Sequence, residues 1–159
     1  MAKFLIIVGA LYFGVIAIAF AMQRSLLYHP DRTRPSPLAS GIPEMKEITV
    51  QTSDGLPLLA WYRPAMTGKP TLVVCHGNAG HIGHRGIKVR PYLDAGYGVF
   101  LIEYRGYGSN PGTPSEDGFY QDGRAALDYL AGAGVSASSI ALYGESIGSG
   151  VCTQLALEQ

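Results

Sequence analysis

The chain opens with an unbroken apolar run. Residues 4–22 contain no charged side chain, and at about 1.5 Å per residue a helix of this length matches the roughly 30 Å hydrocarbon layer of a bilayer. A buried core helix would normally show a polar face, whereas this stretch offers only Tyr12 and small residues. The pattern predicts a membrane-spanning helix, so we expect residues 1–22 to be a single-pass N-terminal anchor that contacts the lipid bilayer through residues 4–22.

A cleaved signal peptide is the alternative for the same segment. Lys3 supplies a positive charge before the apolar run, and Ala19-Phe20-Ala21 resembles a small-x-small cleavage site. The run is longer than a typical signal-peptide core, which favours an uncleaved anchor. The three arginines shortly after the run outnumber Lys3 and the amino terminus, which mildly favours a cytoplasmic C-terminal side and leaves the orientation open.

Residues 23–43 differ in composition and are rich in Pro, Arg and Ser. Four prolines in this stretch exclude a regular helix. We therefore expect a linker over residues 23–43 between the membrane and a domain over residues 44–159. Its Leu26, Leu27 and Tyr28 suit either the lipid interface or the surface of the domain.

The rest of the chain alternates strand-like and helix-like segments. Polar and apolar residues alternate over 47–52 and 56–62 on either side of Asp54-Gly55, which predicts an antiparallel hairpin. Continuous apolar runs predict strands buried on both faces, and they occupy residues 71–75, 99–104 and 140–143. Helices are expected between and after these runs, over residues 81–94, 114–130 and 149–157.

The order of these segments predicts an α/β fold with a mostly parallel sheet covered by helices on both faces. The start of the second helix is marked most clearly. Thr113-Pro114-Ser115-Glu116 has the form of a capping box with proline at the first helical position.

The last predicted strand runs directly into a G-x-S-x-G pattern, Gly144-Glu145-Ser146-Ile147-Gly148. Between a buried strand and a helix, this pattern is typical of a nucleophile elbow. The glycines two residues before and after the serine suit a turn so sharp that Cβ atoms there would collide. Ser146 is the candidate nucleophile, and the helix that follows favours a developing negative charge beside it.

A second glycine-rich motif follows the strand that ends at Cys75, and it reads His76-Gly77-Asn78-Ala79-Gly80. An α/β-hydrolase carries its other oxyanion donor at this place. We therefore expect the backbone N–H groups of Asn78 and Ile147 to form an oxyanion hole, unless the glycines only make tight turns. The supporting residues are His76, Gly77, Gly144, Glu145 and Gly148.

Four segments together carry a family resemblance: QRSLLYHP at 23–30, HGNAG at 76–80, EYRGYGSNPGTPSE at 103–116 and GESIGSG at 144–150. The chain resembles the YfhR/BEM46-like, ABHD-like branch of the α/β-hydrolase superfamily. The resemblance implies an α/β-hydrolase fold and a membrane-anchored serine hydrolase acting on small ester or related acyl substrates. Family members commonly carry Asp where this chain has Glu103, a change expected to matter little. The stretch 104–108 is expected to be structural.

The resemblance also implies a triad acid and histidine after the nucleophile. Thirteen residues follow Ser146; none is Asp or His, and Glu158 is the only acid. We therefore expect the triad Asp and His to be absent from this chain and the fold to be truncated after the elbow helix. His81 and His84 are weaker candidates for a replacement base, and His29 is weaker still.

A truncated sheet has a further consequence. Five predicted strands, against about eight in an intact hydrolase, would leave strand 140–143 as an unprotected edge that invites self-association. The alternative function is accordingly a non-catalytic gene fragment or a membrane-tethered interaction module. A phosphate-binding loop at 106–112 or 148–150 lacks the required spacing.

Composition narrows the remaining classes of function. Twelve Lys and Arg balance twelve Asp and Glu, so no basic surface is expected for nucleic acid. The four histidines lack metal-ligand spacing, and neither a metal nor another cofactor is expected. Cys75 and Cys152 suit small core positions. The 21 glycines, nearly twice the average share of roughly 7%, indicate many tight turns.

Overall fold

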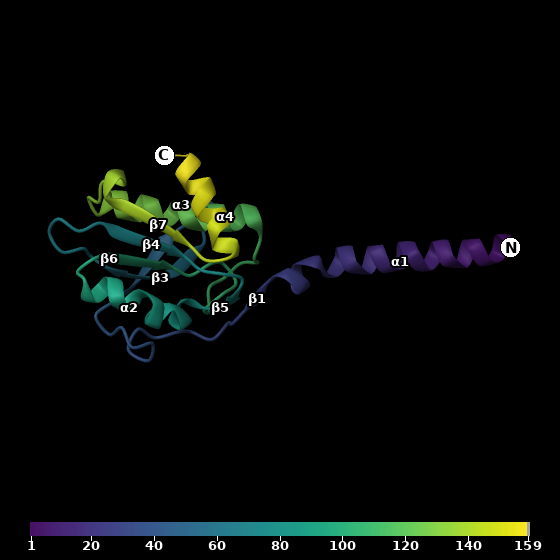
Figure 1. Cartoon of the computed structure of the whole chain (residues 1–159), viewed down its shortest axis with the longest axis horizontal. Helices are drawn as coiled ribbons and strands as arrows, with labels where there is room; N and C mark the ends of the chain where they lie inside the picture. The colour runs from purple at the N-terminus through teal and green to yellow at the C-terminus, as the bar shows by residue number, and fades with distance from the viewer. Residues whose placement is uncertain (159) are drawn as a thin grey trace.

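The computed structural model describes residues 1–158, which form a long N-terminal helix and an α/β domain (Figure 1). Helix α1 covers Ala2–Leu27, buries none of its residues and projects away from the domain. It is long and apolar enough to cross a membrane, with a mean hydropathy of 2.6 over its most apolar window, and a signal sequence has the same properties. The helix continues past the expected end at Met22, because the first proline of the following segment is Pro30.

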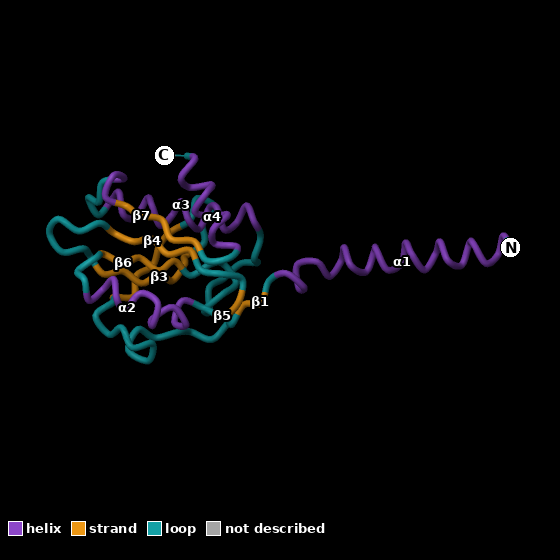
Figure 2. The backbone as a smooth tube through the Cα atoms, viewed as in Figure 1, coloured by secondary structure: helices purple, strands orange, loops and turns teal. Residues whose placement is uncertain are grey.

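Five strands build the central sheet, in the order β2-β3-β6-β4-β7. Figure 2 shows β3, β6, β4 and β7 in this order across the domain. They are β2 (Lys46–Gln51), β3 (Pro57–Arg63), β4 (Thr71–Cys75), β6 (Gly98–Ile102) and β7 (Ile140–Gly144). The β6–β4 and β4–β7 pairs are parallel, whereas β2–β3 and β3–β6 are antiparallel. Strands β2, β4, β6 and β7 therefore run in the same direction and β3 runs opposite to them, so the sheet is mostly parallel, as predicted.

Helices cover both faces of the sheet, as predicted. Alternate residues of a strand point to opposite faces, so Trp61 of β3 packs with α2 (Gly86–Asp94) in one core. Its neighbour Ala60 joins the other core, which includes Phe119 and Leu155. These two residues belong to α3 (Glu116–Gly132) and α4 (Ile147–Leu157), respectively.

Two helix boundaries differ from those predicted. The segment expected as one helix over 81–94 begins as a 3₁₀ turn, Ile82–Arg85, before α2. Helix α3 starts at Glu116 with Ser115 as its cap, whose hydroxyl accepts a hydrogen bond from the Gly118 N–H at 3.2 Å. The expected capping box lies two residues too early, because Ser115 is still extended and its side chain satisfies the first turn.

A short parallel pair, absent from the prediction, fastens the segment after α1 to the domain. Strand β1 (His29–Pro30) pairs with β5 (Ala79–Gly80). The Tyr28 ring packs edge-on against Phe119 with 5.4 Å between ring centroids, whereas Leu26 and Leu27 are exposed. The expected linker is thus docked at its start, and Tyr28 packs on the domain.

Arg105 joins three parts of the domain through buried polar contacts. Its backbone N–H and Nε donate to the two carboxylate oxygens of Asp122 in α3, at 2.9 and 2.8 Å. Its Nη1 donates at 2.7 Å to Asp54 in the hairpin turn. Asp122 is fully buried, and this desolvation raises its pKa to about 6 although the Arg105 bonds oppose the shift. Through these contacts of Arg105, the turn after β6 holds α3 and the hairpin turn together.

We expect Arg105→Ala to lower the free energy of unfolding by about 3–5 kcal/mol at pH 7.5, because it leaves the buried Asp122 carboxylate without its cation. Urea denaturation of the full chain in detergent measures the change. The loss should shrink at pH 5, where Asp122 takes up a proton. Arg34→Ala, which removes an exposed ion pair with Glu47, is the control and should cost about 0–1 kcal/mol. Equal losses in both variants would contradict the role of Arg105.

Candidate active site

Ser146 lies on a sharp turn between β7 and α4. Its backbone has φ 53° and ψ −119°, a left-handed conformation that is rare outside glycine and stores strain. The residue is exposed, and α4 begins immediately after it at Ile147. The first N–H groups of a helix have no acceptor within the helix. The Gly148 and Ser149 N–H groups donate to the carbonyl oxygens of Glu145 and Ser146, both at 2.9 Å. Among the described residues, the Ile147 N–H has no such backbone acceptor, and it lies next to the Ser146 hydroxyl.

The two glycines of the G-x-S-x-G pattern are required by close backbone contacts. A Cβ atom at Gly148 would collide with the carbonyl oxygens of Cys75 and His76 at the end of β4. A Cβ atom at Gly144 would collide with the backbone of Gly148 and Ser149. These contacts let α4 start directly over the end of β4, which fixes the sharpness of the turn.

The HGNAG loop lies against the same turn. The Glu145 N–H donates to the Cys75 carbonyl at 3.0 Å. Gly77 faces the serine so closely that a Cβ atom on it would lie 3.4 Å from the Ser146 Cβ. The structure thus brings together the two motifs that the sequence separates by some seventy residues.

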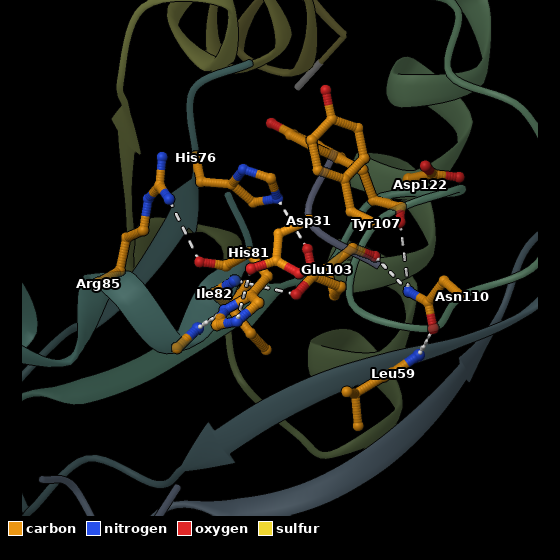
Figure 3. A network of polar contacts seen from close by, with 12 residues as sticks. Asp31, Leu59, His76, His81, Ile82, Arg85, Glu103, Tyr107, Asn110 and Asp122 are labelled. Atoms are coloured by element: carbon orange, nitrogen blue, oxygen red, sulfur yellow. Dashed lines mark hydrogen bonds and ion pairs between the residues drawn. The ribbon is translucent and has the colours of Figure 1, made fainter. Parts of the chain in front are cut away.

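His76 is held inside the protein, beneath the loop (Figure 3). Its Nδ1 lies 2.7 Å from the Gly77 carbonyl oxygen, and its Nε2 lies 3.1 Å from Glu103 Oε1. The second contact is not aligned as a hydrogen bond. Both ring nitrogens therefore face partners other than Ser146, and the histidine supports the loop.

Glu103 connects His76 to the 3₁₀ turn that begins at Ile82. Its other carboxylate oxygen accepts the Ile82 N–H at 2.9 Å, and the residue is fully buried. An Asp side chain is one methylene shorter and could not reach both partners without a backbone shift. The exchange of Asp for Glu was expected to matter little, but this geometry makes the length of the side chain important.

Arg85 links the two motifs, and sequence reasoning missed it. It is only 7% exposed, and its Nη1 donates to the carbonyl oxygens of Ala79 and His81 at 3.0 and 3.2 Å. Its Nε lies 3.4 Å from the Glu145 carboxylate. A hydrogen bond from Lys88 is the main cause of the lowered pKa of Glu145, and the Arg85 charge adds to it. An arginine in a segment predicted as helix gives no signal that a 3₁₀ turn will bury it.

After the loop, His81 faces Asp31 (Figure 3). His81 Nε2 lies 3.5 Å from the Asp31 carboxylate, its Nδ1 accepts the Gly83 N–H at 3.1 Å, and His84 stacks on its ring. The three residues are close enough to share a metal ion. However, a neutral His81 that accepts at Nδ1 carries its proton on Nε2, which then cannot serve as the ligand atom toward Asp31. Within residues 1–158, the hydrogen bonds bring no histidine ring to the Ser146 hydroxyl.

Cys75 and Cys152 are buried beneath the elbow and are not bridged. Their mutual contact, together with burial, raises the pKa of the Cys75 thiol. Both residues therefore sit as small core side chains.

Comparisons with known proteins also indicate an α/β-hydrolase fold. A family model described as alpha/beta hydrolase fold matches residues 70–159. The protein Rv2307c of Mycobacterium tuberculosis is 40% identical, over 96% of this chain and 56% of that protein. Protein bem46 of Schizosaccharomyces pombe is 36% identical, over 89% of this chain and 51% of that protein. A crystal structure of an alpha-beta hydrolase from Vibrio vulnificus is 25% identical with a TM-score of 0.67, over 79% of this chain and 46% of that one.

The chain spans about half the length of these curated relatives. The match to bem46 confirms the family resemblance inferred from the four sequence segments, and the family model and the solved structure confirm the predicted fold.

Two glycines of α4 should respond to alanine in opposite ways. Gly148→Ala should destabilise the chain by at least about 1–3 kcal/mol, the cost of forcing an overpacked contact. Gly150→Ala should stabilise it by about 0.5–1 kcal/mol, because a Cβ atom there meets no other atom within 4 Å and alanine favours a helix. Urea denaturation measures both. Stabilisation of equal size in the two variants would show that helix propensity, and not the contact with β4, governs the elbow.

Proposed function

We propose that this chain, which belongs to the alpha/beta hydrolase fold family, carries the nucleophile and oxyanion hole of a serine hydrolase acting on esters or related acyl bonds. The observation that carries the proposal is the strained, exposed Ser146 held beside Gly77 at the start of α4. In this assignment Ser146 is the nucleophile, and the backbone N–H groups of Asn78 and Ile147 are the oxyanion donors. His76, Gly77, Gly144, Glu145 and Gly148 hold the geometry.

The proposed reaction proceeds by acyl transfer. Ser146 Oγ forms a bond to the acyl carbon, and the negative charge that develops on the carbonyl oxygen is stabilised by the two N–H donors. Collapse breaks the bond to the leaving alcohol, which departs with a proton, and water then hydrolyses the acyl-enzyme. The serine proton must pass to a base. His76 faces Gly77 and Glu103, and His81 faces Gly83 and Asp31, so in this proposal the base is a group other than these two histidines.

We also propose that α1 anchors the protein in a membrane, with residues 4–22 in contact with the bilayer. The support is its length, its hydropathy and the exposure of all its large apolar side chains. The domain would then lie at the membrane surface.

The serine assignment can be tested with a fluorophosphonate probe on the full chain in detergent. We expect slow labelling, because a serine without a base is a weak nucleophile, and we expect added imidazole to accelerate it by supplying that base. Ser146→Ala should abolish both signals, whereas Ser138→Ala, at an exposed serine in the 3₁₀ turn before β7, should leave them unchanged. Labelling that persists in Ser146→Ala, or that stays absent with imidazole, would refute the assignment.

A second candidate function is a membrane-tethered interaction module, and the edge of the sheet favours it. Strand β7 pairs only with β4 among the described strands, and Ala141 and Tyr143 on it are exposed. An apolar hollow of about 210 Å³ lies alongside, lined in part by Ile140 and Leu142. Unpaired strand edges pair readily with other strands, so we propose that chains self-associate through β7.

Lysines on this edge should reduce the association. We expect the double variant Ala141→Lys and Tyr143→Lys to shift the chain toward monomer in analytical ultracentrifugation in detergent, because charge on an edge strand opposes pairing. The control carries lysines at exposed Ser138 and Thr153 and should associate like the wild type. A wild-type chain that is monomeric at every concentration would exclude this candidate.

A further inference from the structure

An apolar pocket lies between the end of α1 and the nucleophile elbow. It has a volume of about 240 Å³. Its walls come from three elements that are distant in sequence: Leu27 and Tyr28 at the end of α1, Phe119 in α3, and Ile147, Gly150 and Val151 in α4. The pocket is thus shared between the apolar N-terminal helix and the first turns of the helix that carries the candidate nucleophile.

The pocket begins next to the candidate reaction centre. Ile147 directly follows Ser146, and its N–H is a proposed oxyanion donor. A substrate whose carbonyl oxygen lies at that N–H could extend an apolar chain along Ile147 toward Val151 and Phe119, which are both buried. At the rim, Glu116 accepts a hydrogen bond from the Tyr120 hydroxyl at 2.6 Å. This carboxylate disfavours an anionic ligand and favours the neutral chain of an ester.

The end of α1 is fixed to the loop on the other side of the site. The Asn78 side-chain amide donates to the Leu27 carbonyl at 2.7 Å, and the His29 N–H donates to the Asn78 carbonyl at 3.0 Å. Figure 1 shows that α1 leaves the domain at the end where α3 and α4 begin. The helix that would enter the bilayer is therefore attached to the same end of the domain as both site motifs.

The distance along α1 places the pocket at the membrane surface. The uncharged run ends at Met22, and Leu27 lies five residues later, about 7–8 Å farther along a helix. The headgroup layer on each side of a bilayer is about 5–8 Å thick. The pocket opening at Leu27 and Tyr28 would therefore lie within or just outside the headgroups.

From this arrangement we propose that the pocket receives the acyl chain of a membrane lipid ester, which enters directly from the bilayer. Its volume is below the roughly 300–1,000 Å³ of pockets for drug-sized ligands, so it holds one chain segment and not a whole two-chain lipid. The position of the scissile bond at Ser146 rests on the proposed function, whereas occupation of the pocket by the chain does not.

The test uses the full chain reconstituted in phosphatidylcholine vesicles that contain a non-hydrolysable glycerol alkyl ether with a diazirine near the end of its chain. After irradiation, mass spectrometry maps the cross-linked residues. We expect cross-links at Tyr28, at residues 119–120 and at residues 147–151, besides those along α1. Gly150→Trp should lower the domain cross-links by about tenfold or more, because excluding two buried CH₂ groups already has that effect.

The controls separate the pocket from folding and from catalysis. A Cβ atom at Gly150 meets nothing within 4 Å, so tryptophan should be accepted, and Gly150→Leu is a smaller second variant. Ala156→Trp fills the hollow beside β7 on the same helix and should leave the cross-links unchanged. Cross-links confined to residues 4–22, or domain cross-links that both Gly150 variants leave unchanged, would overturn the proposal.

Ser146→Ala distinguishes this proposal from the proposed function. We expect it to retain the domain cross-links while losing fluorophosphonate labelling. Cross-links at the pocket in a chain whose serine never reacts would preserve the pocket and refute the nucleophile. A reactive serine with no domain cross-links would support the nucleophile and refute the pocket.

Discussion

The candidate site depends on the close approach of α4 to the end of β4. At Gly148 the helix backbone contacts the carbonyl groups of Cys75 and His76, leaving no room for a side chain. Because the helix begins so near the sheet, the chain must turn from β7 within two residues, and this forces Ser146 into a left-handed conformation. The same approach brings the elbow against the HGNAG loop. One backbone contact therefore sets the strain, the exposure and the neighbours of the serine.

Around this contact, buried charges hold the loop that faces the serine. Glu103 lies between His76 and the Ile82 N–H, while Arg85 lies between two loop carbonyl groups and Glu145. Buried charged groups are costly unless they are paired. A shift of the loop would leave these groups without partners, so the network resists movement of the HGNAG motif relative to the elbow. Rigidity of this kind is what an oxyanion hole requires.

The parts of the fold that were predicted correctly have strong local signals. The apolar run at 71–75 is a strand with the predicted bounds, and the Asp54-Gly55 turn joins the two strands of the hairpin. The G-x-S-x-G pattern marked the elbow although only Gly144 answers to a local contact, with Gly148 and Ser149, whereas Gly148 answers to the contact with the end of β4. Errors arose where tertiary contacts decide the structure. The sequence around Thr113 suits a capping box, yet the helix starts only after Ser115. Nothing near Arg85 or Glu103 in sequence reveals the partners that bury them.

The short pair between β1 and β5 has a consequence for any cut in the N-terminal segment. A cut after Ala21 would remove most of α1 and leave Leu27, Tyr28 and the β1–β5 pair in place. A cut after Asp31 would instead take away His29 and Asp31, whose N–H groups donate to the carbonyl oxygens of Asn78 and Gly80. A cut before Leu27 therefore frees the domain from its apolar helix and keeps every contact of the HGNAG loop with this segment, including the bond from the Asn78 side chain to the Leu27 carbonyl. The loop that faces Ser146 is thus held in place by residues that precede the serine by more than a hundred positions in the sequence.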